Sequence, residues 1–286
     1  MKIWITGAQG LIGQALERLC KKQRLPFIPT GHAKVDISSQ SSIKAFFHAN
    51  SNMTHVINCA AYTRVDDAEN QAEEAFKANT LGPENIGKLA HHEGLKLVHL
   101  STDYVFDCEN PSLLPETAPY QPSSVYAKTK QEGEVRLLAE FPHACIVRTS
   151  WVFGRGGKNF ISSLWNRLHQ EKTISVVHDQ VNRLTYASDL AEALLALLCH
   201  EGIFHFANQG IASRYDVAVK MRELLQANGK ILPCEEIVKT SASTFPTLAA
   251  RPRFSILDTQ KIERIIGISP RNWQDALKEF VDEQSS

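Results

Sequence analysis

The stretch KIWITGAQGLIG, residues 2–13, decides the fold. An apolar run ends in a glycine-rich turn at Gly7, Gly10 and Gly13, and apolar residues at helical spacing follow from Leu11. Glycines in such a turn allow a tight bend and a close approach of the backbone to a pyrophosphate, and the free N–H groups of the helix start face the anion. The spacing is Gly-x-x-Gly-x-x-Gly rather than the commoner Gly-x-Gly-x-x-Gly, so a plain structural turn is the alternative. At the start of an alternating chain, the turn predicts a dinucleotide site.

Strand-like and helix-like runs alternate through the first half of the chain. Short apolar runs predict strands at residues 2–6, 26–29, 55–59, 96–100 and 144–149. Residues 69–91 carry apolar positions at helical spacing and predict one long helix. This alternation is typical of an α/β fold, a Rossmann-like, doubly wound parallel sheet with crossover helices.

The pattern changes after Trp151, but the short run 203–206 is expected to return to the main sheet. We therefore predict a dinucleotide-binding domain formed by residues 1–150 plus about 178–206. Residues of about 151–177 plus 207–286 are predicted to form a smaller, intertwined C-terminal substrate-binding lobe.

Composition limits the partners of this chain of 286 residues. Lys+Arg and Asp+Glu both number 31, so charge gives no reason to expect nucleic acid or an anionic membrane as a partner. Six cysteines are scattered without a C-x-x-C pair, which predicts free thiols in a reducing compartment. No uncharged apolar stretch is long enough to span a membrane and no signal peptide is evident, so we expect a cytoplasmic protein. His91-His92 and His178-Asp179 lack further ligands at a recognised spacing, and no metal site is predicted.

Tyr126 and Lys130 lie four residues apart in a segment predicted to be helical. Residues at this spacing lie one turn above each other, so an ammonium can sit near a phenol. Neighbouring positive charge favours the phenolate and brings the phenol into the range of a proton donor. Taken alone, the pair is also compatible with an exposed helix face.

The segment that follows the second predicted strand bears on the choice of cofactor. An acidic residue about 20 positions after the glycine turn accepts the ribose 2′-hydroxyl of NAD and repels a 2′-phosphate. Residues 30–34 read Thr-Gly-His-Ala-Lys, with no carboxylate and with Lys34 available, which favours NADPH and still allows NADH. Asp36 comes shortly after, and it is expected near the adenine edge or on the ribose itself.

Four motifs together resemble the extended short-chain dehydrogenase/reductase superfamily. They are the glycine turn, NCAA at 58–61, STDYVF at 101–106 and the Tyr126-x-x-x-Lys130 pair. Within the superfamily the chain is most similar to the dTDP-4-dehydrorhamnose reductases, because it also carries RTSWVFG at 148–154, NF at 159–160 and ARP at 250–252. The resemblance runs nearly from end to end.

The resemblance implies a role for each matching residue. Tyr126 would be the proton donor, Lys130 would bind the nicotinamide ribose and lower the pKa of the tyrosine, and Thr102 would orient the substrate carbonyl. The implied cofactor-binding residues are Gly7, Gln9, Gly10, Leu11, Ile12, Gly13, Asp36, Ile37, Ala60, Ala61, Tyr62, Tyr126 and Lys130. The implied substrate-binding residues are Thr63, Thr102, Asp103, Tyr126, Trp151, Asn159 and Arg251. Trp151 offers a sugar an apolar face, and Arg251 offers a diphosphate a planar donor fork.

The implied activity is NADPH-dependent reduction of the C4 ketone of a nucleotide sugar, dTDP-4-dehydro-L-rhamnose, to dTDP-L-rhamnose. Two alternatives stay open, namely a non-catalytic regulatory subunit similar to that of methionine adenosyltransferase, and another nucleotide-sugar reductase or epimerase. Some family members hold magnesium at a dimer interface with glutamates, where this chain has Ala15 and Ser188. We therefore expect no magnesium site of that type. The dimer that depends on it becomes doubtful, although a homodimer stays open.

Overall fold

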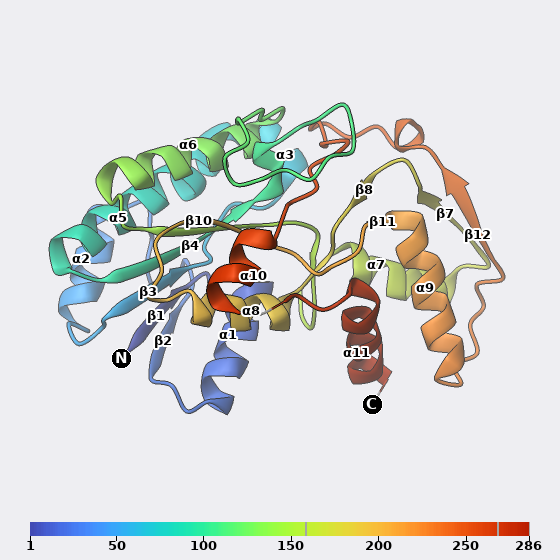
Figure 1. Ribbon diagram of the computed structural model, residues 1–286, viewed down its shortest axis with the longest axis horizontal. Helices are drawn as coiled ribbons and strands as arrows, with labels where there is room; N and C mark the ends of the chain where they lie inside the picture. Colours follow the sequence, from blue (N-terminus) through green and yellow to red (C-terminus); the bar gives the residue numbers. More distant parts are fainter. Residues whose placement is uncertain (158, 268, 286) are drawn as a thin grey trace.

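A six-stranded parallel sheet forms the centre of the computed structural model, which describes residues 1–157, 159–267 and 269–285 (Figure 1). The strand order is β10-β5-β4-β3-β1-β2, and every pair of neighbours is parallel. The strands are β1 (Ile3–Thr6), β2 (Phe27–Thr30), β3 (His55–Asn58), β4 (Lys96–Thr102), β5 (Cys145–Thr149) and β10 (Gly202–Phe206). The predicted fold class is confirmed, and the run at 203–206 does return to the sheet.

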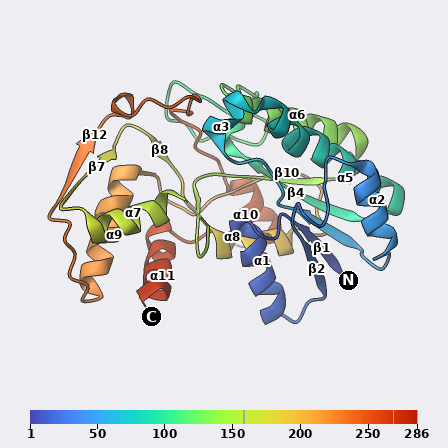
Figure 2. The same cartoon turned by 180° about the vertical axis from the view of Figure 1, so that it is seen from behind.

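Helices cover both faces of this sheet, because buried residues alternate between the two sides of each strand (Figures 1 and 2). Ile3 and Ile5 pack with α1 (Leu11–Lys22) and α8 (Ala187–Ala196) on one face. Trp4 points to the other face, where α2 (Gln40–His48), α5 (Gly82–Glu93) and α6 (Val125–Glu140) pack. Such strands are buried on both sides, as expected for a parallel sheet.

A second, smaller group of elements, which we call the outer lobe, stands beside the carboxyl ends of the strands. It has its own apolar core, in which Phe153, Leu168, Met221 and Phe280 are buried. Its strands are β6 (Val152–Phe153), β7 (Thr173–Val177), β8 (Val181–Asn182), β9 (Thr185–Tyr186), β11 (Ala212–Ser213) and β12 (Glu236–Thr240). Its helices are α7 (Phe160–Gln170), α9 (Arg214–Ala227), η3 (Ala242–Thr244) and α11 (Trp273–Ser285).

The predicted boundary between the domains stays a prediction, and two contacts run across it. β8 pairs with β11 of the outer lobe, although residues 178–206 are predicted to belong to the sheet domain. Conversely, α10 (Gln260–Ile266) belongs to the predicted substrate-binding lobe but packs on β10 of the sheet. Its Ile262 lies in the apolar core on the α1 and α8 face of the sheet. The two parts are therefore interleaved.

The single helix predicted at 69–91 is wrong, because this part of the chain forms four shorter elements. They are α3 (Val65–Asn70), α4 (Ala72–Phe76), a π-helical turn η1 (Lys77–Leu81) and α5. Gln71 interrupts the first pair with a non-helical backbone. In η1 the buried Asn79 side chain accepts from the N–H of Tyr62 at 2.8 Å and donates to Thr129 Oγ1 of α6 at 3.2 Å. The π turn thus ties the loop after β3 to α6.

No helix in the described part of the chain is both long enough and apolar enough to cross a membrane.

Candidate functional site

A cleft of about 1040 Å³ lies between the carboxyl ends of the sheet strands and the outer lobe. Open parallel sheets bind ligands at this edge. All but one of the residues implied as cofactor- or substrate-binding line this single cleft, the exception being Asp36. The fold thus brings together residues that are up to 244 positions apart in the sequence, from Gly7 to Arg251.

The glycine turn forms one end of the cleft and has the shape that a dinucleotide requires. Gly7 has a φ of 62°, and a Cβ there would lie 2.6 Å from the backbone nitrogen of Ala60. A Cβ on Gly13 would lie 2.4 Å from the carbonyl oxygen of Gly7, so the start of α1 packs tightly on the turn. This helix starts at Gly10 without a side-chain cap and without an acidic residue in its first turn. The residues therefore fit a pyrophosphate, which would meet free N–H groups and the positive end of the helix.

Asp36, which is predicted to contact the cofactor, does not line the cleft, whereas its neighbours Val35 and Ile37 do, so its role stays a prediction. Its Oδ1 accepts from the N–H of Ser38 at 2.9 Å and from the hydroxyl of Ser38 at 2.8 Å, so the carboxylate closes a local turn outside the cleft lining. Lys34, the cation considered for a 2′-phosphate, is exposed and lies over the ring of Phe46 at 5.6 Å. Gly31 and His32 line the cleft instead. The spacing from the glycine turn could not show this, because the bend after β2 decides which side chains face inward.

The proposed proton donor, Tyr126, lies on the first turn of α6 at the floor of the cleft. Ser124 caps this helix by accepting from the N–H of Ala127, which fixes where the turn begins. The Tyr126 ring is 8% exposed and packs edge to face on Tyr104 at 5.6 Å. Thr102, at the end of β4, hydrogen-bonds the Tyr126 phenol, so the two hydroxyls lie together in the cleft.

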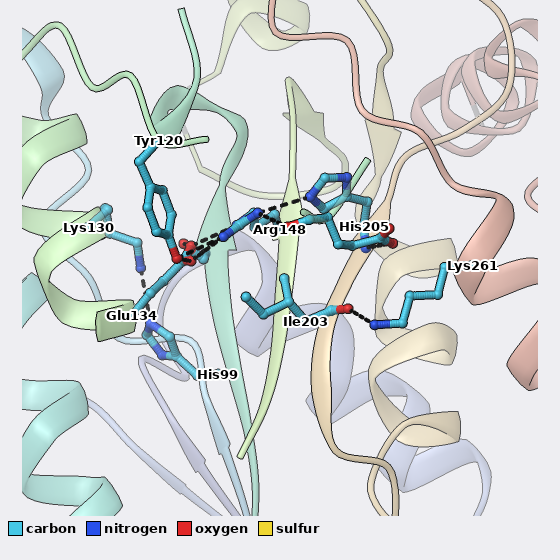
Figure 3. A network of polar contacts seen from close by, with 10 residues as sticks. His99, Tyr120, Lys130, Glu134, Arg148, Ile203, His205 and Lys261 are labelled. Carbon is cyan, nitrogen blue, oxygen red and sulfur yellow. Dashed lines mark hydrogen bonds and ion pairs between the residues drawn. The ribbon is translucent and has the colours of Figure 1, made fainter. Parts of the chain in front are cut away.

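Lys130 lies one turn further along α6 and is 2% exposed. Its Nζ donates to the carbonyl oxygen of Leu100 at 2.8 Å and lies 3.5 Å from His99 Nε2 (Figure 3). Burial lowers the pKa of Lys130 to about 8, and the charge of Glu134 opposes this shift.

The expected effect of Lys130 on the pKa of Tyr126 stays a prediction. Burial raises the pKa of Tyr126 well above its usual value, and the charge of Asp103 adds to the shift, while only the bond to Thr102 opposes it. The Lys130 ammonium donates one of its hydrogen bonds to the backbone carbonyl of Leu100.

Asp103 follows Thr102 and is 2% exposed beside the same hydroxyls. Its Oδ2 accepts from Asn182 Nδ2 of β8 at 2.8 Å and from the hydroxyl of Ser255 at 2.5 Å. Burial raises the pKa of this carboxyl to about 6, although both donors favour the charged form. Asp103 therefore fastens the outer lobe to the end of β4.

The far end of the cleft is aromatic and cationic. Trp151 has a φ of 40°, which is unusual for a residue with a side chain, and its ring lies 4.7 Å from the guanidinium carbon of Arg214. The same guanidinium lies 4.7 Å from the ring of Phe160, so it is held between two aromatic faces. Arg214 was missed from the sequence, and it directly follows Ser213, which caps α9 in a reciprocal pair with Asp216.

The other residues implied for substrate binding differ in what they contact. Arg251 forms a bidentate ion pair with Asp66, with Nη–O distances of 2.6 and 3.1 Å, so its charge is already neutralised. Asn159 caps α7 by accepting from Ser162, and its buried Nδ2 has no hydrogen-bond partner among the described residues. Thr63 is exposed at the cleft edge.

The two positions where some relatives carry magnesium-binding glutamates lie on helices that pack together. Ala15 is buried in α1 against α8, the helix that contains Ser188, and a small residue suits this close contact. Within residues 1–157, 159–267 and 269–285, no group of three or more His, Cys, Asp or Glu side chains is placed to hold a metal ion.

Comparison with known proteins agrees with this geometry. A solved dTDP-4-dehydrorhamnose reductase from Clostridium acetobutylicum is 36% identical, covers 100% of both chains and superposes with a TM-score of 0.94. A dTDP-4-dehydrorhamnose reductase from Bacillus anthracis, solved in complex with NADP, is 29% identical over 99% of both chains with a TM-score of 0.91. A Streptomyces antibioticus protein, named a probable dTDP-4,6-dihydroxy-2-methyloxan-3-one 4-ketoreductase, is 36% identical over 98% of this chain and 94% of its own. The family model described as the RmlD substrate binding domain matches residues 1–286. The chain therefore belongs to the RmlD substrate binding domain family.

Proposed function

We propose that this protein reduces the C4 ketone of dTDP-4-dehydro-L-rhamnose to give dTDP-L-rhamnose, with NADPH as the reductant. The observation that carries the proposal is that Thr102, Tyr126 and Lys130 meet at the floor of one cleft. The glycine turn, Trp151 and Arg214 line the same cleft. The names of the relatives support the substrate, and the NADP bound to the Bacillus anthracis protein supports the cofactor.

Two side chains of this chain, Thr102 and Tyr126, would perform the acid half of the reaction. Bound NADPH supplies the hydride for the carbonyl carbon. Thr102 and Tyr126 would both hydrogen-bond the carbonyl oxygen, which holds it in place and stabilises the negative charge that develops on it. Tyr126 would then give its phenolic proton to this alkoxide. The high pKa of the buried phenol keeps it protonated until that charge appears.

The remaining residues would bind and orient the two ligands. The turn at Gly7, Gly10 and Gly13 would hold the pyrophosphate of the cofactor, and Lys130 would hold its nicotinamide ribose. Trp151 would lie against the sugar, and the unpartnered Nδ2 of Asn159 would donate to the substrate. Asp36 Oδ1 accepts from Ser38, and a contact of Asp36 with the adenine or ribose stays a prediction.

The test is the oxidation of NADPH in the presence of dTDP-4-dehydro-L-rhamnose, with Tyr126→Phe as the variant. We expect the variant to bind NADPH like the wild type and to lose turnover by about 10²- to 10⁴-fold, the usual contribution of a general acid. Unchanged turnover would refute the role of Tyr126.

The same assay separates the alternatives. Turnover only with another dTDP-4-keto sugar would move the proposal to a different 4-ketoreductase, as the name of the Streptomyces antibioticus relative suggests. NADPH binding without turnover of any such sugar would favour a non-catalytic regulatory subunit. NADH in place of NADPH tests the cofactor preference.

A further inference from the structure

Three polar side chains form a row beneath the cleft, on three neighbouring strands. Thr6 of β1 is the register partner of Asn58 of β3, which is in turn the register partner of His99 of β4. Register partners in a parallel sheet point to the same face, so the three side chains lie side by side. The Thr6 hydroxyl donates to Asn58 Oδ1 at 2.6 Å, and Asn58 Nδ2 lies 3.0 Å from His99 Nδ1. The other ring nitrogen of His99 faces Lys130 (Figure 3).

The backbone fixes the direction of these hydrogen bonds. The N–H of Ala60, which can only donate, lies 3.2 Å from Asn58 Oδ1 and 3.3 Å from Thr6 Oγ1, and both this N–H and the Thr6 hydroxyl have an acceptor when Oδ1 faces them. The amide nitrogen of Asn58 therefore faces His99, and it too can only donate, so Nδ1 of His99 must be the acceptor. Burial and the charge of Lys130 hold the pKa of His99 well below its usual value, which keeps the ring neutral. A neutral ring that accepts at Nδ1 carries its proton on Nε2, directed at Lys130.

Lys130 lies among groups with opposing effects on its charge. Leu100 accepts a hydrogen bond from the ammonium, and Glu134 on the same helix favours the charged form. Burial favours the neutral amine, and Cys59, which directly follows β3, holds its proton because its own pKa is raised to about 12. An N–H of His99 that points at Nζ repels an ammonium but can donate to a neutral amine. His99 therefore favours the neutral amine of Lys130, as burial does.

We propose that His99 is a positioning residue that makes Lys130 readier to release its proton, because Asn58 and Thr6 hold the ring in the Nε2–H tautomer. The proposal rests on the proposed function, in which Tyr126 becomes a phenolate once it has protonated the alkoxide. An N–H bond of the Lys130 ammonium breaks, and that proton restores the phenol O–H. The neutral amine left behind accepts the Nε2–H of His99, and water from the cleft returns a proton to it.

The first test needs no turnover. In protein labelled with ¹⁵N in histidine, the ring shifts distinguish the two neutral tautomers, and His99→Gln identifies the resonance among the 11 histidines. We expect His99 to be protonated on Nε2. Asn58→Asp places a carboxylate, which can only accept, next to Nδ1 and should convert the ring to the Nδ1–H tautomer. A wild-type ring protonated on Nδ1 would overturn the proposal.

The second test is the pH dependence of the ¹⁵Nζ resonance of Lys130, together with that of kcat/KM. With a pKa near 8, the charged amine and the reduction rate should both decline above about pH 8. His99→Gln should move this midpoint upward, and Asn58→Asp should move it upward by about one unit, a tenfold change in proton affinity. The double variant, Asn58→Asp in the His99→Gln background, measures how much of the shift in the Lys130 midpoint comes from the added charge alone.

Equal midpoints in wild type and His99→Gln would contradict the proposal, provided that both proteins bind NADPH and unfold at similar temperatures. If no nucleotide sugar is reduced, the proposed function fails, but the tautomer and the Lys130 titration still decide the role of His99. His91→Gln, on the exposed end of α5, is the matched control. It should change neither the tautomer of His99 nor the titration midpoint of Lys130.

Discussion

Gly133 sets the distance between α6 and the π turn, and its replacement by alanine tests whether this contact positions the catalytic side chains. Gly133 lies on α6 three residues after Lys130 and faces η1. A Cβ at this position would lie 2.0 Å from the carbonyl oxygen of Asn79, whereas real Cβ contacts essentially never fall below 3.0 Å. The atom in the way belongs to the backbone, so the two elements must separate by about 1 Å.

We expect Gly133→Ala to lower the stability of the protein, which is the opposite of the usual effect of this substitution in a helix. Glycine to alanine inside a helix normally stabilises by about 0.8–1.0 kcal/mol. Overpacking a tight contact costs about 1–3 kcal/mol, so we expect a net loss of up to about 2 kcal/mol and a melting temperature lower by up to about 8 °C. Since a misplacement of about 1 Å can reduce turnover by about 10²-fold, kcat should fall far more than stability does.

Thermal unfolding and NADPH oxidation measure the two effects, and Gly87→Ala on the facing helix α5 is the matched control. Its Cβ would meet the Cδ1 atom of Leu137 at 2.7 Å, the end of a side chain that can rotate away. We expect this control to keep its activity. A Gly133→Ala protein with wild-type kcat and melting temperature would refute the reasoning.

Two further predictions concern charged side chains. Glu134 and Arg148 form an ion pair at 2.7 Å in which both side chains are at most 1% exposed (Figure 3), so Glu134→Gln should cost about 3–5 kcal/mol of unfolding free energy, measured with urea. Glu132→Gln, which breaks an exposed pair with Arg136, should cost less than about 1 kcal/mol, and equal losses would contradict the effect of burial. Arg214→Met should raise the KM for the nucleotide sugar by about 10- to 100-fold without changing the affinity for NADPH, because a charged hydrogen bond contributes about 1.5–3 kcal/mol. Arg222→Met, further along the same helix, is the control, and an unchanged KM in Arg214→Met would exclude it from the substrate site.

The sequence was sufficient wherever the signal was local. The apolar run before Gly7 and the spacing after Leu11 predicted β1, the turn and α1, and four further apolar runs predicted strands that pair in the sheet. The reciprocal cap of Ser213 and Asp216 was also readable, because both partners lie within one turn of helix. The resemblance to the reductases predicted further residues that line the cleft, residue by residue, but not Arg214.

What could not be predicted depends on which distant segments meet. Arg214 comes 63 positions after Trp151, and only the packing of α9 against α7 places its guanidinium between two rings. The π turn could not be read from periodicity, since its cause is the bond from Asn79 to the distant Thr129.

The late return of β10 to the sheet limits how this protein can be recombined with its relatives. After β5 the chain builds β6, α7 and three short strands of the outer lobe before α8 and β10 rejoin the sheet. It then leaves again to form β11, α9, β12 and α11. A chimera with a single crossover would therefore combine half of one lobe with half of another and divide the buried core that they share. Exchanging the outer lobe to change sugar specificity requires two segments, one on each side of α8 and β10, to be replaced together.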